Sequence, residues 1–261
     1  FVTDHNGFRK INFLKIMPPN KKYIFIDKTL FFPEEGILVV GDLHIGYEHM
    51  LRQSGVLVPE RQIKDMIAEL DEIFKKIKKE KQKLNKIIFL GDIKHAFGFQ
   101  FQERNEFRQV MDFLIQHVPK ENIILIKGNH DTMDYSYGNM KEYYIDGELA
   151  FLHGHKPYPE MFDKKVKVVV IGHLHPSIIL EEKPGVKREA YKCFLTGSYK
   201  NKTFIVVPSF IGFVEGTPVN DYKEDYMGSF SVIPRFEILK FKIHVVGDDK
   251  VYDFGTVKDL N

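Results

Sequence analysis

Five short polar clusters contain the residue types that bind metal ions. Each cluster directly follows an apolar run, and in chain order they are Gly41-Asp42-Leu43-His44, Gly91-Asp92, Gly128-Asn129-His130-Asp131, His153-Gly154-His155 and Gly172-His173-Leu174-His175. Imidazole, carboxylate and amide groups together suit Mn, Fe or Zn, whereas an all-oxygen set would suit Ca or Mg. A single cluster is a weak signal, because Asp and Gly are common turn formers at strand ends. All five in order favour a metal centre.

The spacing within the clusters also favours metal binding. In Asp-x-His and His-x-His, residues two apart point the same way on an extended strand, so both side chains can face one ion. The set of candidate ligands is too large for one tetrahedral zinc but fits two ions that share a carboxylate; its members are Asp42, His44, Asp92, Asn129, His153, His173 and His175. Two ions about 3.5 to 4 Å apart can clamp both oxygens of an in-line phosphoryl displacement. Their charge exceeds that of two aspartates, so the loaded site would attract phosphate.

The apolar runs before the clusters predict the strands that position them. These buried strands are expected at residues 37–40, 87–90, 123–126, 149–152 and 168–171. Apolar residues also recur every three or four positions from Ile63 to Ile77 and from Phe107 to Leu114, which predicts two amphipathic helices. A β-α-β-α-β order implies parallel strands. Because α/β proteins bind ligands beyond the carboxyl ends of such strands, the clusters should converge.

The pattern changes after Pro176 to strands with short turns. We expect these strands at residues 177–180, 191–195, 203–207 and 236–246, and they suggest a second sheet packed on the first. The predicted fold class is α/β, a four-layer α/β/β/α sandwich of two mixed sheets flanked by helices. No linker divides the chain, so residues 1–261 are expected to form a single domain.

Composition limits the function classes. The formal net charge of +2 provides no overall basic field for nucleic acid. The single cysteine, Cys193, lies in a strand-like run, which predicts a buried structural thiol and suits a reducing compartment. No apolar stretch approaches the roughly 20 residues that cross a bilayer, and the N-terminal residues lack a signal peptide's apolar segment. We therefore expect a cytoplasmic protein with no membrane partner.

The five clusters, in this order, resemble the calcineurin-like metallophosphoesterases, whose motifs run Asp-x-His, Gly-Asp, Gly-Asn-His-Asp/Glu, His and Gly-His-x-His. The match extends from Gly41 to Pro176. This resemblance implies the four-layer sandwich and a dinuclear site. One ion would take Asp42, His44 and His175, the other would take Asn129, His153 and His173, and Asp92 would bridge them. A metal-bridging hydroxide would attack the phosphate, and His130, which is not a ligand, would protonate the leaving oxygen.

One motif narrows the branch of the family. Protein phosphatases have Gly-Asp-x-x-Asp where this chain has Gly91-Asp92-Ile93-Lys94-His95, a form similar to the double-strand-break-repair nucleases. His95 would then assist His130, although it could also be a polar loop residue. We find no pattern for the long capping domain or the coiled-coil insertion with which those nucleases grip DNA, so we expect the small prokaryotic branch related to the SbcD nucleases to be the better match. His155 either supports a ligand or faces the substrate.

These observations predict a dinuclear metal-dependent phosphoesterase, either a phosphodiesterase or a phosphomonoesterase, acting on a nucleotide-type or other phosphate ester. Its cofactors would be two divalent transition-metal ions, Mn first, with Fe, Zn or Ni as alternatives. A nuclease acting on DNA or RNA is the alternative activity, and the low net charge disfavours it. A non-catalytic scaffold of the same fold is a third candidate, which the complete ligand set disfavours. The oligomeric state is not predicted.

Overall fold

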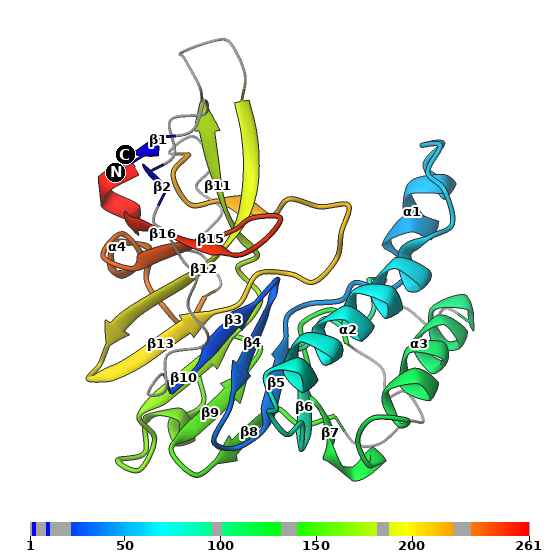
Figure 1. Cartoon of the computed structure of the whole chain (residues 1–261), viewed down its shortest axis with the longest axis horizontal. Helices are drawn as coiled ribbons and strands as arrows, with labels where there is room; N and C mark the ends of the chain where they lie inside the picture. The colour runs from blue at the N-terminus through cyan, green and yellow to red at the C-terminus, as the bar shows by residue number, and fades with distance from the viewer. Residues whose placement is uncertain are drawn as a thin grey trace.

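The computed structural model describes residues 2–3, 9–10, 22–95, 101–131, 140–181, 188–221 and 231–260. In these parts of the chain, two mixed β-sheets pack face to face, and helices cover the outer face of the smaller sheet (Figure 1). A separate short ribbon pairs β1 (Val2–Thr3) with β2 (Arg9–Lys10). The α/β sandwich of two mixed sheets predicted from the sequence is confirmed.

The first sheet has the order β3-β4-β5-β6-β7. Its strands are β3 (Ile24–Ile26), β4 (Thr29–Phe32), β5 (Ile37–Val40), β6 (Lys86–Phe89) and β7 (Ile123–Leu125). The last three are parallel, as the crossovers required. The crossovers contain α1 (Tyr47–Gln53), α2 (Gln62–Lys79), α3 (Phe101–Leu114) and the turn η1 (Lys120–Asn122). The hairpin of β3 and β4, which extends the sheet beyond β5, was not among the predicted elements.

The second sheet is larger and is built entirely from residues after the third cluster. Parallel strands β9, β10 and β13 form its middle, and the antiparallel strands β8, β11, β12, β15 and β16 surround them, while β14 pairs in parallel with β11. The bounds are β8 (Tyr143–Asp146), β9 (Leu149–Leu152), β10 (Val168–Ile171), β11 (Pro176–Glu181), β12 (Arg188–Tyr199), β13 (Lys202–Val206), β14 (Thr217–Pro218), β15 (Lys242–Val246) and β16 (Val251–Thr256).

One predicted strand is partly wrong. Residues 236–246 were expected to be extended throughout, but the structure has helix α4 (Arg235–Ile238) first and only then strand β15. Ile238 is buried, whereas Phe236 is exposed. One helical turn therefore buries Ile238 against the second sheet, and the apolar run contains two elements rather than one.

Three hydrophobic clusters separate four layers. Alternation along β5 sends Leu38 and Val40 toward α2 and α3, while Val39 faces the second sheet. Along β9, Phe151 completes this inner cluster, and Leu152 points outward. The fourth layer consists of short helices on the outer face of the second sheet, namely η2 (Pro159–Phe162), α4 and η4 (Val257–Leu260). Strands buried on both faces explain why their sequences are apolar throughout.

The predicted amphipathic helices and the buried cysteine are confirmed. Met66, Leu70, Ile73, Phe74 and Ile77 of α2 are all buried against the first sheet. Cys193 lies fully buried in β12, and burial raises the pKa of its thiol. Among the helices that the structure describes, none is long and apolar enough to cross a membrane.

Candidate metal centre

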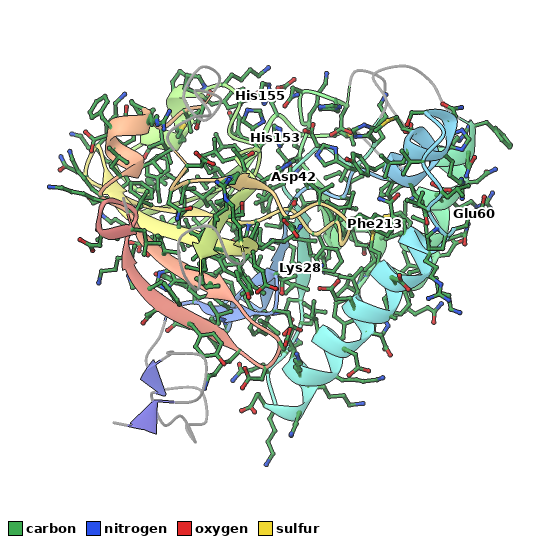
Figure 2. All side chains as sticks on the ribbon, turned by 90° about the horizontal axis from the view of Figure 1, so that it is seen from above. Lys28, Asp42, Glu60, His153, His155 and Phe213 are labelled. Atoms are coloured by element: carbon green, nitrogen blue, oxygen red, sulfur yellow. The ribbon has the colours of Figure 1, made fainter. Side chains whose placement is uncertain are left out.

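The carboxyl ends of five strands from both sheets meet at one end of the sandwich. Figure 2 shows Asp42, which follows β5, close to His153, which follows β9; His153 Nδ1 lies 3.2 Å from Asp42 Oδ1. The main-chain nitrogen of His173, which follows β10, also donates to Asp42 Oδ2 at 3.0 Å. The clusters therefore converge as expected, but across two sheets rather than along the edge of one.

Four candidate ligands adopt the left-handed backbone region, which residues other than glycine rarely occupy. They are His44 (φ 44), Asp92 (φ 44), His173 (φ 65) and His175 (φ 42). Such conformations are unfavourable for these residue types and concentrate at functional sites. The sharp turns bring the side chains inward directly after their strands end.

One group of candidate ligands is Asp42, His44 and His175, whose ligand atoms all lie within 4.8 Å of one another. The Nε2 atoms of His44 and His175 are 3.3 Å apart. Asp42 Oδ2 lies 3.5 Å from His175 Nε2. This is the set that the family resemblance assigned to one ion.

The second group is Asp92, His153 and His173. His153 Nε2 lies 2.9 Å from Asn129 Oδ1, 3.1 Å from His173 Nδ1 and 3.4 Å from Asp92 Oδ2. The other ring nitrogen of His153 is 2.9 Å from the main-chain oxygen of Leu90, which can only accept a hydrogen bond. Nδ1 therefore carries a hydrogen, and Nε2 is the nitrogen that would bind an ion after losing its proton.

Asp92 lies between the two groups. Its Oδ2 is 3.4 Å from His153 Nε2 and 4.0 Å from His44 Nε2, and its Oδ1 accepts a hydrogen bond from the main-chain nitrogen of His130 at 2.8 Å. One carboxylate oxygen therefore faces a histidine of each group. This is the placement that a bridging ligand requires.

The electrostatics of the centre favour a bound cation. Burial opposes the ionisation of Asp42, but His175 and His153 outweigh it and hold the pKa of this carboxyl well below its usual range. Burial also opposes the protonation of His153, yet Asp42 and Asp92 raise its pKa to about 10. By contrast, burial lowers the pKa of His44 to about 3 and that of His173 to about 4. Two buried carboxylates thus require positive charge, while neutral imidazoles beside them offer lone pairs.

The residues fit a pair of transition-metal ions. Imidazole nitrogens, carboxylates and an amide oxygen match the preferences of Mn, Fe and Zn. The two groups each contain one aspartate and two histidines, and Asp92 Oδ2 also faces His44 of the first group. Asp42, His44, Asp92 and His153 are buried, whereas His130, Asn129, His173 and His175 are partly exposed. The centre is therefore open to solvent on the side of these partly exposed residues.

His130 and His95 lie beside the first group, and with His44 they form a third group whose ring nitrogens lie within 4.8 Å of one another. His130 Nδ1 is 2.7 Å from the main-chain oxygen of His95, and its Nε2 is 4.0 Å from Asp92 Oδ2. The His95 ring lies nearly parallel to that of His130 at a centroid distance of 5.7 Å, and it contacts the Tyr47 ring at 4.8 Å. The contact that orients His130 thus comes from the backbone of His95, while its ring lies alongside.

His155 lies at the edge of the second group. Its ring centroid is 5.2 Å from that of His153 and 6.1 Å from that of His173. Burial lowers the pKa of His155 to about 4, with His153 and Lys156 adding to the effect. A neutral His155 beside the ligands is consistent with both roles considered from the sequence.

Asp131 has a role that the sequence did not reveal. It closes the third cluster, and its buried carboxylate accepts hydrogen bonds from the main-chain nitrogens of Gly128 at 2.9 Å and Ile93 at 3.1 Å. Asp131 therefore ties the loop after β7 to the loop after β6. The acidic residue directly after Asn129-His130 was the available signal, but only the fold shows its partners.

Comparisons with known proteins agree with this geometry. Residues 36–163 match the family model described as calcineurin-like phosphoesterase. The chain therefore contains a calcineurin-like phosphoesterase domain, and its two mixed sheets form a metallophosphoesterase α/β sandwich. A search of curated proteins found no match.

One solved structure shows the same fold. The crystal structure of the Pseudomonas putida nuclease MPE overlays with a TM-score of 0.57 at 20% identity, covering 87% of this chain and 92% of that one. A metallophosphoesterase from Sphaerobacter thermophilus aligns at 12% identity over 84% of this chain and 88% of that one. Its TM-score of 0.31 is too low to support an argument. The first overlay establishes the shared architecture.

Proposed function

We propose that this protein is a dinuclear metal-dependent phosphoesterase that hydrolyses a phosphate ester. The observation that carries the proposal is the meeting of two ligand groups, each with one aspartate and two histidines, at one end of the sandwich. The calcineurin-like phosphoesterase domain at residues 36–163 supports hydrolysis as the reaction class. Mn is the metal we expect, with Fe, Zn and Ni as alternatives that the same donors accept.

Each site residue has a role in this proposal. Asp42, His44 and His175 would hold one ion, Asn129, His153 and His173 the other, and Asp92 would touch both. When bound, the ions supply Lewis acidity toward a phosphoryl group. The Nδ1 hydrogen of His130 is held by the His95 carbonyl, so a protonated His130 would give the Nε2 proton to the leaving oxygen. His95 would assist by keeping this ring in place.

Turnover of simple esters tests the proposal. The purified protein, freed of metal and then loaded with Mn²⁺, should hydrolyse bis-p-nitrophenyl phosphate, p-nitrophenyl phosphate or both. The metal-free protein serves as the control. Preference for the diester would identify a phosphodiesterase, and preference for the monoester a phosphomonoesterase. A protein that binds two Mn²⁺ ions yet turns over neither compound would refute the proposal.

A nuclease is the second candidate, and the shared fold with the Pseudomonas putida nuclease MPE favours it. The net charge of +2 gives no overall attraction to a phosphate backbone. Binding to single-stranded DNA or RNA would weaken steeply as salt rises, because phosphate contacts release counterions. Cleavage of single-stranded DNA or RNA, together with binding that weakens as salt rises, would favour a nuclease over an enzyme that acts on small esters. Turnover of small esters without strand binding would favour a small substrate.

A further inference from the structure

The buried segment 207–211, in the second half of the chain, contacts the backbone of Gly41 and Asp42 at the candidate metal centre. Residues 207–211 follow β13, and all five are buried although they belong to no helix or strand. The main-chain nitrogen of Val207 still donates to Ile171 O of β10 at 2.8 Å, but the carbonyl oxygens of residues 209–211 accept none of the backbone hydrogen bonds between described residues. Burial without partners is unfavourable for a carbonyl oxygen, so its partners must come from elsewhere.

Two lysines supply these partners, one from each sheet. The Nζ of Lys192, on β12, donates to the main-chain oxygens of Ser209 at 2.8 Å and Ile211 at 2.5 Å, and to Ser209 Oγ at 2.8 Å. The Nζ of Lys28, in the turn between β3 and β4, donates to the main-chain oxygen of Phe210 at 2.8 Å. Three consecutive carbonyl oxygens are thus held by two ammonium groups.

The same segment presses against the first candidate ligand. The main-chain nitrogen of Phe210 donates to the main-chain oxygen of Asp42 at 2.9 Å. The carbonyl oxygen of Pro208 lies so close to Gly41 that a Cβ added there would be 2.1 Å from it. Figure 2 labels Lys28, Asp42 and Phe213, which lies just beyond this segment. The backbone at Gly41 and Asp42 is therefore fixed by residues more than 160 positions later in the sequence.

We propose that Lys192 and Lys28 are positioning residues of the metal centre. They hold the 207–211 segment against Gly41 and Asp42, and so they fix the Asp42 carboxylate between the histidines of the second sheet. This inference rests on the proposed function, because it assigns Asp42 to an ion. Within the part of the chain that the structure describes, the hydrogen bonds of the two lysines go to the 207–211 segment and the ion pair of Lys28 goes to Glu69. The contact between the lysines and Asp42 therefore runs through the backbone of the segment.

Lys202 offers a matched control. Its Nζ donates to the main-chain oxygens of Asp163 and Val166, each at 2.7 Å, and the residue is 8% exposed. It begins β13, whereas the metal centre lies beyond the carboxyl end of that strand's neighbour, β10. Lys202→Met thus removes the same kind of buried lysine-to-carbonyl contact without disturbing the 207–211 segment.

Metal affinity, measured without reference to activity, tests the inference. Full-length wild type, Lys192→Met, Lys28→Met and Lys202→Met would each be titrated with Mn²⁺ by calorimetry, well below the unfolding temperature of each protein. Substitution of a residue that orients a metal ligand typically lowers metal affinity roughly 10- to 100-fold. We expect a loss of that size for Lys192→Met and Lys28→Met, and wild-type affinity for Lys202→Met even where all three are less stable.

Two results would overturn the inference. One is unchanged Mn²⁺ affinity in both Lys192→Met and Lys28→Met; the other is an equal loss in Lys202→Met, which would indicate general loosening. If Lys192→Met does not fold, Lys28→Met decides, because Lys28 holds one carbonyl oxygen of the segment whereas Lys192 holds two. A wild-type protein that binds no Mn²⁺ would overturn the proposed function as well. If wild type, Lys192→Met and Lys28→Met all bind two Mn²⁺ ions with the same affinity, only this inference is overturned and the proposed function stands.

Discussion

His153 Nε2 lies 3.4 Å from Asp92 Oδ2, although the two residues follow strands of different sheets. The Asp92 Oδ2 atom faces the Nε2 atoms of His44 and His153, one from each ligand group, whereas Asp42 meets His153 on its Nδ1 side. Asp92→Asn keeps the shape but removes the charge that two cations would share. We expect turnover of p-nitrophenyl esters to fall at least about a hundredfold and bound Mn²⁺, measured by elemental analysis, to fall below two ions.

Asp112→Asn is the control for that experiment, because Asp112 is an exposed residue of α3 that pairs only loosely with Arg108. It should keep wild-type turnover and metal content. Wild-type rate and two bound ions in Asp92→Asn would show that the bridging role is wrong.

His130 is expected to act on the substrate and not on the ions. His130→Ala should lower turnover roughly 10²- to 10⁴-fold, the usual contribution of a general acid, while two Mn²⁺ ions remain bound. His95→Ala should have a smaller effect, because the main-chain oxygen that holds His130 Nδ1 is still present. Steady-state kinetics and metal analysis check both variants. Loss of an ion from His130→Ala would instead identify His130 as a ligand.

Close backbone packing around Asp92 provides a third prediction. A Cβ added to Gly128 would lie 2.1 Å from Asp92 Oδ1 and 2.2 Å from its main-chain nitrogen. Gly128→Ala should therefore displace Asp92 and weaken Mn²⁺ binding, whereas Gly212→Ala should not, because a Cβ there meets no atom within 4 Å. Calorimetric titration of the two variants measures the difference. Equal affinities would contradict the packing argument.

Lys192 should make stability depend on pH. Burial lowers the pKa of Lys192 to about 7; the charge of Lys28 lowers it further, and the charges of Glu69 and Asp42 partly oppose this. A lysine in an unfolded chain has a pKa of about 10.4. Between these values the unfolded chain binds more protons than the folded one, so the free energy of unfolding rises with pH. The slope is at most about 1.4 kcal/mol per pH unit.

Urea unfolding of the metal-free protein between about pH 7 and pH 10 measures this slope. Tyrosines and Cys193 also titrate in that range, so the comparison is between wild type and Lys192→Met. The free energy of unfolding of wild type, relative to that of Lys192→Met, should increase as pH rises. Parallel curves for the two proteins would mean that Lys192 titrates normally in the folded state.

Much of the site could be predicted because each ligand directly follows a strand that apolar composition makes recognisable. Val39 and Val40 precede Asp42, and Val170 and Ile171 precede His173. The candidate ligands could therefore be identified as the polar residues that follow each apolar run. Which sheet each strand joins was not predictable in the same way. The pairing of β10 with β13 joins residues far apart in the chain, and no local pattern encodes it.

The missed elements lacked a local signal. The turn between β3 and β4 is Asp27-Lys28, without the glycine that usually marks a two-residue hairpin. Lys192 did carry a signal that was overlooked, because it shares the inward face of β12 with Phe194, two residues on. A lysine on a buried face must find acceptors there. Those acceptors, in residues 209–211, could be found only from the fold.

The division of labour between the two halves of the chain has a consequence for assembly. Every strand of the first sheet precedes residue 126, and every strand of the second follows residue 142, so each half brings an incomplete share of the donors. A bound pair of ions would be coordinated by residues of both halves and would link them non-covalently. Two fragments cut between Asp131 and Met140 should then associate more tightly with Mn²⁺ than with a chelator.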